Sequence, residues 1–576
     1  MLPLKLVLFG LSSLGAWELL RLICKDRIDI NFLPSLTIAI QVTVLFFAGL
    51  LNILPEAAVA LYIAGFTGLI FSIYQCRGLS FIKNYFSVGY IVLLITISIM
   101  SLYVHEKTFV HYDNFSHWAL VVKTMLLNDR YPTFKDIIIE FQEYPLGSST
   151  YVYFFAKLTS QREPIQMLAQ VYMLIAGILP IFAFAKKNKI AIAVVAISFI
   201  NFIFVYNIRP TDLLVDTLLP VTGICGLLFA YMYCNTNSTK LELWLTSFYM
   251  VQLVQIKNSG IFFAVIIVIL LLKRMPLHKQ YLHTILCVLF SFFTVMLWHK
   301  HCRYVFQSAE SSYHALTYEH LNHIFKSKSA DDIRSICTAL FKFAATYKDI
   351  WVILGLFAMT GILLWLINRT QFKPFLNIVI FSLTIYTGYQ IGMAGMYVFS
   401  MGLDESLGLA GVVRYTKTIL IAIMYLYMVC LVQFISDINT YRFRSSLLVV
   451  YSFLSFFVYT YISNGEIDIS ILYTPDSSTR RWVETIKSIY NIPDDNSYCT
   501  LISSSDSGYI YYLTRYVFYS THTSSLIVDI ADDMDSIDTD YILVYDQENE
   551  VINTWIRENY PEQYGNCAIV NWKKQN

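Results

Sequence analysis

The stretch that decides the fold class is residues 189–208, which read KIAIAVVAISFINFIFVYNI. Lys189 is the only charged side chain among these twenty residues. The hydrocarbon core of a bilayer is about 30 Å thick and takes about 20 mainly apolar residues per helix, so this stretch predicts a membrane-spanning helix. Thirteen further stretches share this character, and together they predict a polytopic α-helical membrane protein with about 14 transmembrane helices. The predicted spans are 2–24, 33–54, 56–76, 84–104, 165–185, 189–208, 212–233, 241–257, 260–273, 281–299, 350–367, 375–397, 415–437 and 445–463.

Composition agrees with this class and excludes others. Of the 576 residues, 56% are hydrophobic and only 14% are charged, against roughly 25% charged in an average soluble domain. Lys and Arg number 41 and Asp and Glu number 40, so no basic excess indicates a nucleic-acid partner. Ten cysteines form no CxxC pair, so we expect no zinc site. The partner that the composition indicates is the lipid bilayer.

The positions of Lys and Arg in the short connections predict which side of the membrane each loop faces, because basic loops stay in the cytoplasm. The alternation works only if the apolar stretch 145–158 does not cross, so we expect it as a helix lying at the outer surface. The basic connections carry Lys25 and Arg27, Arg77 and Lys83, Lys186, Lys187 and Lys189, Lys273, Arg274 and Lys279, Arg369 and Lys373, and Arg442 and Arg444.

This arrangement divides the chain into two predicted parts. Residues 1–463 form the predicted transmembrane domain, and residues 464–576 form a small extracytoplasmic α/β domain of ordinary domain size. Short β-rich runs and one helix-like stretch, Glu548–Glu558, are predicted in the second part. The predicted outer loops of the first part are 105–164, 209–212, 300–349 and 398–414. The β-rich runs are Tyr498–Ile502, Tyr509–Tyr519, Ser525–Ile530, Tyr541–Tyr545 and Cys567–Trp572.

The first outer loop carries the strongest indication of chemistry. Asp113 lies in the segment 111–118, which follows directly on a predicted span and leads into a helical run, 119–127. A carboxylate at the water-side end of a membrane helix is placed to meet a lipid-borne donor and a water-side acceptor, and a helix gives it a rigid mount for general-base work. The alternative is that Asp113 only caps the helix beginning near Phe115.

The order of pieces in this loop resembles that of a known superfamily. The aspartate is followed by a helix that ends in Asn128-Asp129-Arg130-Tyr131-Pro132, and then by Tyr144-Pro145-Leu146-Gly147 at the entry to a surface helix. This order resembles the first extracytoplasmic loop of the GT-C glycosyltransferases, which use polyprenyl-phosphate sugars and include the protein O-mannosyltransferases and the lipid A aminoarabinose transferases. The resemblance covers residues 84–270 and, in general plan, the later spans.

The resemblance implies roles for particular residues. Asp113 corresponds to the catalytic aspartate of the superfamily, and His117 and Tyr144 of the same loop are expected to bind the substrate. Many members have an acidic residue where this chain has Asn114, and a Pro-Pro pair where it has Pro145-Leu146. These departures leave the subfamily and any need for a divalent metal ion, Mg²⁺ or Mn²⁺, open.

Two later stretches contribute further candidates. The segment 206–216 resembles the second outer loop of the superfamily, which carries another acidic residue beside the first. By spacing Asp212 is the better candidate for this second catalytic acid, and Asp216 is the alternative, expected one helical turn deeper in a span. Lys257 interrupts an apolar run where the superfamily has a lysine between two helices. Lys257 is expected to stabilise a departing lipid phosphate. Two arginines at the outer boundary are further phosphate-binding candidates by position, Arg209 and Arg414.

The loop 300–349 is expected to cover the cavity as a lid, with an amphipathic helix over 330–343. Its histidines are spaced by six and three residues, which differs from the i, i+4 pair of a helical zinc site, so surface or sugar-contact roles are favoured over metal binding. These histidines are His314, His320 and His323.

The expected function is therefore that of an inverting glycosyltransferase in a bacterial plasma membrane. It would move a sugar from a polyprenyl-phosphate donor to a glycan or other hydroxyl acceptor on the extracytoplasmic face, with a cell-wall or surface polysaccharide as the expected acceptor. Two alternatives remain from the sequence. One is a polysaccharide polymerase or ligase, and the other is a lipid-linked sugar transporter or flippase, which would need ionisable residues at mid-membrane depth.

Overall fold

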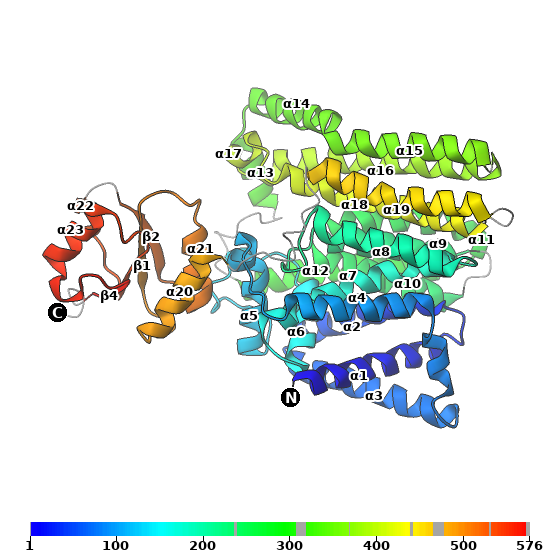
Figure 1. Cartoon of the computed structure of the whole chain (residues 1–576), viewed down its shortest axis with the longest axis horizontal. Helices are drawn as coiled ribbons and strands as arrows, with labels where there is room; N and C mark the ends of the chain where they lie inside the picture. Colours follow the sequence, from blue (N-terminus) through cyan, green and yellow to red (C-terminus); the bar gives the residue numbers. More distant parts are fainter. Residues whose placement is uncertain are drawn as a thin grey trace.

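A computed structural model describes residues 2–235, 239–306, 318–367, 369–437, 442–464, 477–528 and 531–571. Most helices run side by side in one bundle, and the last hundred residues lie at one end of it (Figure 1). We call this the site end of the bundle. The helices at the predicted spans are α1 (Leu2–Ile23), α2 (Leu33–Leu50), α3 (Leu54–Gln75), α4 (Val88–Val104), α7 (Glu163–Ile178), α8 (Lys189–Tyr206), α9 (Leu218–Tyr233), α10 (Lys240–Ile256), α11 (Gly260–His278), α12 (Tyr281–Val305), α15 (Lys348–Ile367), α16 (Phe372–Phe399), α18 (Val412–Asp437) and α19 (Arg442–Asn464).

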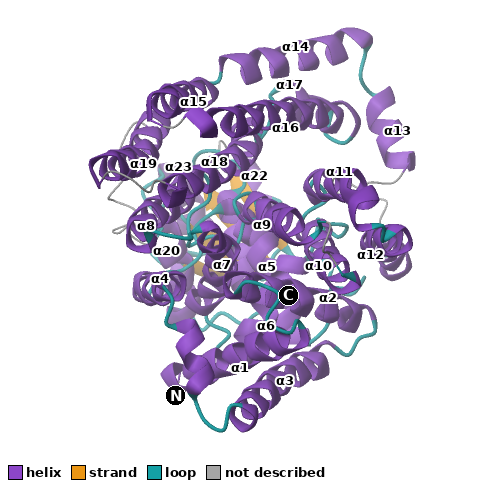
Figure 2. Cartoon of the chain, turned by 90° about the vertical axis from the view of Figure 1, so that its right-hand side faces the viewer, coloured by secondary structure: helices purple, strands orange, loops and turns teal. Residues whose placement is uncertain are grey.

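The helices have the length and composition of a polytopic helical membrane protein. Among the described residues, 10 helices are long and apolar enough to cross a membrane, and α4, α9 and the apolar part of α19 are shorter apolar helices. A helix lies at each of the fourteen predicted spans, but the number that cross stays a prediction. Viewed along the helices, α7, α9 and α18 lie inside the bundle, with α1 and α3 at one edge and α14 (Ala330–Thr346) and α15 at the other (Figure 2).

The central helices form the core of the bundle. The most apolar 18 residues of Glu163–Phe184 are 89% buried and those of Val412–Ser436 are 94% buried, whereas those of α3 are only 22% buried. A helix that is apolar all round and buried by protein belongs to the interior, and one that exposes apolar side chains has the character of a lipid-facing helix. The polar residues that the core helices carry at the site end are therefore held on a rigid frame.

One predicted boundary at the site end is wrong. The span predicted over 212–233 begins as a helix only at Leu218, so Asp212 and Asp216 lie in an irregular segment and are not one helical turn apart. The stretch 145–158 does form a helix, α6 (Gly147–Leu158), and residues 147–156 are all buried. This helix packs against α2, α5 (Ala119–Asn128) and α7. Its place at the outer face of the membrane stays a prediction.

The predicted lid region is helical where it is described. It contains α13 (Tyr318–Lys326) and α14 (Ala330–Thr346), and α14 confirms the helix predicted over 330–343. Ser329 and Asp332 form a capping box at its start, which is the sequence signature of a helix N-terminus. His314 lies outside the described residues.

The chain from Ser477 onward forms a C-terminal α/β region around one sheet. The sheet has the order β2-β1-β3-β4, in which β1 is parallel to β2 and β3, and β4 is antiparallel to β3. The predicted strand Tyr498–Ile502 is confirmed as β1, and the predicted helix after Glu548 is confirmed as α23. The elements are α20 (Ser478–Ile489), β1 (Tyr498–Ile502), α21 (Tyr509–Phe518), β2 (Thr523–Ile527), α22 (Ala531–Asp535), β3 (Tyr541–Val544), α23 (Glu550–Asn559) and β4 (Ala568–Val570).

The β-rich run predicted over Tyr509–Tyr519 is wrong, because these residues form α21. Tyr, Ile and Val favour strands, but Ile510, Leu513 and Val517 recur at helical spacing and all three are buried. The carboxylate of Asp506 accepts hydrogen bonds from the backbone N–H groups of residues 508 and 510. Helical burial and this N-terminal cap outweigh the β propensity of the aromatic residues.

The pairing of α1 with α3 gives a direct test of the packing. A Cβ atom added at Gly15 would overlap the backbone carbonyl oxygen of Gly65, whereas one at Gly10 would meet nothing within 4 Å. We predict that Gly15→Ala forces the two backbones apart and lowers the free energy of unfolding by about 1–3 kcal/mol. Thermal unfolding in detergent, followed by tryptophan fluorescence, measures this change. Gly10→Ala on the same helix is the matched control and leaves the midpoint unchanged or slightly higher. Equal midpoints for the two variants would contradict the close packing.

Candidate functional site

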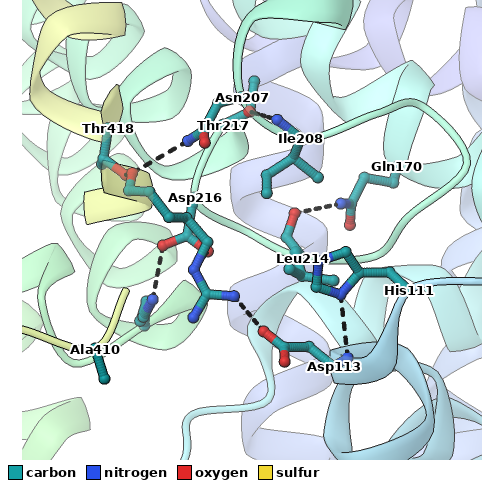
Figure 3. A network of polar contacts seen from close by, with 12 residues as sticks. His111, Asp113, Gln170, Asn207, Ile208, Leu214, Asp216, Thr217, Ala410 and Thr418 are labelled. Atoms are coloured by element: carbon teal, nitrogen blue, oxygen red, sulfur yellow. Dashed lines mark hydrogen bonds and ion pairs between the residues drawn. The ribbon is translucent and has the colours of Figure 1, made fainter. Parts of the chain in front are cut away.

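Four segments that are distant in sequence meet at the site end of the bundle. They are the start of η3 (Asn114–Trp118), the irregular segment 207–217, the end of α10 and the start of α18. Asp113 and Asp216 point into the same space between these segments (Figure 3). The predicted candidates from three of the four outer regions are therefore neighbours in space.

Alternating charges join these segments in what we call the ion chain, which consists of Asp113, Arg414, Asp216 and Lys257. The guanidinium of Arg414 is paired with the carboxylate of Asp113, and its Nε lies 3.6 Å from Oδ2 of Asp216. The ammonium of Lys257 donates to Oδ1 of Asp216 at 2.8 Å. The side chain of Asp216 is 4% exposed and that of Asp113 is 24% exposed. The chain thus runs from a buried acid to a partly accessible one.

The backbone before the helix sets the position of Asp113. Asp113 precedes η3, a π-helical turn, and its N–H donates to Nδ1 of His111 at 3.1 Å. Its side chain makes no capping hydrogen bond to this turn, so the alternative of a simple helix cap is wrong. The carboxylate is directed to Arg414 instead. Single π turns are found frequently at functional sites.

The burial of Asp216 and its partners determine its charge. Burial by itself would raise the pKa of this carboxyl, but attraction to Lys257 and Arg414, with the hydrogen bond from Lys257, holds its pKa below the usual value. Asp216 is therefore ionised at neutral pH. One buried carboxylate between two cations fixes both cations in place, and with Asp113 on Arg414 the four residues of the ion chain are formally neutral.

The predicted acid Asp212 has a different environment. Its Oδ1 accepts a hydrogen bond from Nδ2 of Asn114 at 2.9 Å, while Oδ1 of Asn114 accepts from the N–H of Leu213 at 3.0 Å. Gln170 of α7 donates to the carbonyl oxygens of Asp212 and Leu214. Burial raises the pKa of Asp212. The structure therefore places Asp212 beside the ion chain, where it ties the segment 207–217 to η3.

The end of α10 is shaped to present Lys257. The helix ends at Ile256, and Lys257 is extended, with φ −161° and ψ 150°. The next helix, α11, begins at Gly260, where an added Cβ would overlap the carbonyl oxygen of Leu253. Glycine therefore lets α11 start against the last turn of α10. The sharp break turns the lysine into the site.

The aromatic surroundings complete the site. Nζ of Lys257 lies 4.9 Å from the ring centroid of Tyr415, and Cζ of Arg414 lies 5.3 Å from it. The predicted substrate-binding residue Tyr144 lies on the same side, and burial raises the pKa of its hydroxyl. Arg209 is exposed and is outside the ion chain, although its charge acts on Asp212. Cations over an aromatic face are stabilised by the ring quadrupole.

His117 is buried in an aromatic box. It is 3% exposed, its ring lies edge-on to those of Trp118, Phe141 and Tyr144, and among the described residues neither ring nitrogen has a hydrogen-bond partner. Burial lowers its pKa to about 3, so the imidazole is neutral at pH 7. Burying a polar group without a hydrogen-bond partner costs free energy.

An apolar cavity of about 430 Å³ opens beside Lys257. Lys257, Tyr144 and Tyr415 form its polar end, and side chains of α11 and α16 form its wall, with one residue from α13 of the predicted lid region. One end of this cavity is therefore charged and polar, and the rest of it is apolar. The other lining residues are Asn258, Ser259, Ile261, Phe262, Leu321, Tyr389, Gly392, Met393, Gly395, Met396, Phe399, Ser400 and Met401.

The acids of the site do not form a metal centre. Within the described ranges, no three His, Cys, Asp or Glu side chains gather closely enough to hold one metal ion. Asp113 and Asp216 are both engaged by cations of the chain. This donor set does not fit a resident divalent ion, and we assign no residue to one.

Sequence reasoning missed three contributors. Tyr415, His111 and Asn114 each contact the ion chain or its support. Two of them, His111 and Asn114, lie within two residues of Asp113, and the sequence marks Asn114 only as a departure from the resemblance.

Comparison of the chain with protein-family models, with curated proteins and with solved structures found no match.

Removal of the shared carboxylate gives a stability test. We predict that Asp216→Asn lowers the free energy of unfolding by about 3–5 kcal/mol, because Lys257 and Arg414 lose the buried acid that compensates them. Heat-induced unfolding in one detergent measures this loss. The exposed Asp404→Asn on α17 (Leu403–Leu407) is the matched control and is expected to have no effect. The ion chain would not be a stabilising unit if both variants unfolded at the same temperature.

The buried His117 gives a pH test. Its pKa falls from an ordinary 6.5 to about 3 on folding, so the unfolded chain binds a proton in this range that the folded chain does not. Stability is complete above pH 6.5 and falls by up to about 1.4 kcal/mol per pH unit as the pH drops toward 3. His117→Phe removes this pH dependence. We therefore expect the free energy of unfolding of the variant, relative to that of the wild type, to rise as the pH falls from 7 to 4. His105→Gln, at an exposed position, should follow the wild type. Parallel pH profiles for wild type and His117→Phe would show that the imidazole is not held neutral.

Proposed function

We propose that the protein is a GT-C-type glycosyltransferase that moves a sugar from a polyprenyl-phosphate donor to a hydroxyl acceptor. The observation that carries this proposal is the ion chain at the mouth of an apolar cavity. In it an accessible carboxylate, Asp113, and a cation that lines the cavity, Lys257, are two ends of one connected group. The site end would then face away from the cytoplasm, in a plasma membrane, as the basic loops predict.

The cations suit the leaving group of this reaction. A departing lipid phosphate develops negative charge, and preorganised cations stabilise such charge most effectively in a site that excludes water. Lys257 provides a compact charge at the polar end of the cavity, and Arg414 provides a planar fork that matches two phosphate oxygens. Asp216 would hold both cations at the right separation, and would not itself touch the acceptor.

The cavity suits the lipid part of the donor. Its wall between α11 and α16 is largely apolar, with Phe262, Met393 and Phe399 among the lining residues. An isoprenoid chain that leaves the bilayer for this wall loses no apolar environment and gains van der Waals packing against it. A donor lying here would place its phosphate at Lys257 and its sugar toward Asp113.

The proposed chemistry is one displacement at the anomeric carbon. The acceptor oxygen forms a bond to this carbon while the bond to the phosphate oxygen breaks, and the acceptor proton passes to the carboxylate of Asp113. The products are the glycosylated acceptor, with inverted anomeric configuration, and the free lipid phosphate. Because Arg414 is paired with Asp113 without substrate, the incoming phosphate would compete for Arg414 and free the carboxylate to act as a base.

The position of the charges disfavours the transporter alternative. Asp113 precedes η3, Lys257 follows the last residue of α10, and Arg414 lies in the first turn of α18. A transporter would be expected to carry such groups at mid-membrane depth in broken helices. A polymerase or ligase would rely on arginine-rich loops, whereas this site depends on two aspartates. We therefore place transfer of a single sugar ahead of both alternatives.

The test is the composition of surface glycans in cells that depend on this protein. Deletion of the protein is expected to remove one monosaccharide linkage, and Asp113→Asn is expected to give the same loss at a normal protein level in the membrane. We expect at least a hundredfold lower transfer, in line with loss of a general base. Asp404→Asn is the control and restores the glycan. A glycan restored by Asp113→Asn would refute the proposed mechanism.

A further inference from the structure

The C-terminal α/β region contacts the chain just ahead of Asp113. Both backbone polar groups of Phe109 are held by side chains, since its N–H donates to Oε2 of Glu163 at 2.8 Å and its carbonyl oxygen accepts from Nη1 of Arg480 at 2.5 Å. Glu163 is the first residue of α7, and Arg480 lies on α20. We call these three residues the Phe109 clamp. It fixes the backbone four residues before the candidate base.

The two side chains of the clamp also bind each other. Nη2 of Arg480 lies 2.8 Å from Oε1 of Glu163, and the hydroxyl of Tyr516 donates to the same oxygen at 2.7 Å. The side chain of Arg480 is 5% exposed and that of Glu163 is 17% exposed. Arg480 also pairs with Glu484 of its own helix at 2.8 Å. Charge-assisted hydrogen bonds are strong when solvent is excluded, and loss of Arg480 removes the cation that Glu163 and the carbonyl oxygen of Phe109 share.

Aromatic contacts extend the same surface on both sides of Asp113. The hydroxyl of Tyr509 donates to the carbonyl oxygen of Val110 at 3.0 Å. The ring of Phe115 lies 5.8 Å from that of Tyr509 and 5.3 Å from that of Tyr516. Helix α21 therefore touches the chain before and after the carboxylate, and the segment 109–115 has little freedom to move independently of it.

A second contact docks the C-terminal region against residues 138–140, outside the clamp. Arg515 is paired with Glu140, donates to the carbonyl oxygen of Ile138 at 3.0 Å, and is only 6% exposed. The hydroxyl of Tyr512 also donates to Glu140, and its ring lies 4.9 Å from that of Tyr112. Because Arg515 and Glu140 are not part of the clamp, we expect loss of the clamp to leave the region docked. Docking and positioning are therefore separable by mutation.

We propose that the C-terminal α/β region is a positioning element of the site, in which Arg480 and Glu163 hold the Phe109 backbone and thereby set Asp113 against Arg414. Arg480 and Glu163 are positioning residues, since they act through the backbone and do not reach the reacting atoms. The consequence of this positioning for sugar transfer rests on the proposed function, but the clamp itself does not.

Hydrogen exchange of the full-length protein in detergent, read by mass spectrometry, tests the clamp without any substrate. We expect Arg480→Ala to raise exchange in peptides covering 109–115 by about tenfold or more, because the charge-assisted bonds that hold Phe109 are lost. The sheet strands β1 and β3 should keep their protection. Arg480→Lys retains the charge and should recover part of the protection. Arg557→Ala, which removes a surface contact with Tyr564, is the control and should match the wild type.

Two outcomes would overturn the proposal. The first is unchanged exchange at 109–115 in Arg480→Ala. The second is faster exchange at 109–115 with transfer equal to the wild type in the glycan assay. An equal increase throughout β1 and β3 in Arg480→Ala would mean general unfolding, and Glu163→Gln then decides. This variant removes the charge of the pair on α7, so it should loosen 109–115 while β1 and β3 keep their protection, and unchanged exchange at 109–115 in it would overturn the proposal. If Asp113→Asn also kept full transfer, the proposed function would fail while the exchange result still decided the clamp.

Discussion

The buried carboxylate of Asp216 is the constraint on which the site depends. It lies between an ammonium and a guanidinium, and it compensates the charge of both cations at a point where its own side chain is only 4% exposed. Because Lys257 comes from the end of α10 and Arg414 from the start of α18, the same contact also fixes how these helices meet. Under the proposed function, the same arrangement would preorganise the two cations for the lipid phosphate, since they need not be gathered when it binds.

Sequence reasoning located the parts of this site but not their connections. Apolar length identifies a span such as 189–208 from local composition alone, and the break at Lys257 is visible for the same reason. That Arg414 pairs with Asp113, three hundred residues earlier, is a tertiary contact that no local pattern encodes. The distinct environments of Asp212 and Asp216 were also hidden, because a helix was expected over residues that the structure leaves irregular.

The C-terminal region shows the same limit. Aromatic residues over 509–519 have strand propensity, and only the buried positions of α21 show that helical spacing prevails. Arg480 was not singled out, because nothing near it in the sequence marks it, yet it reaches the backbone of Phe109. The helix bundle and the C-terminal region therefore both contact the loop that carries Asp113. The bundle supplies the cations and the apolar cavity, and the C-terminal region holds the segment that carries the acid.

The most direct test of the central claim is a structure determined with a short-chain polyprenyl phosphate bound. The account predicts phosphate oxygens between the Lys257 ammonium and the Arg414 guanidinium, the isoprenoid chain along α11 and α16, and the Asp113 carboxylate released from Arg414. A phosphate bound elsewhere, with the Asp113 and Arg414 side chains still paired and the cavity beside Lys257 empty, would contradict it.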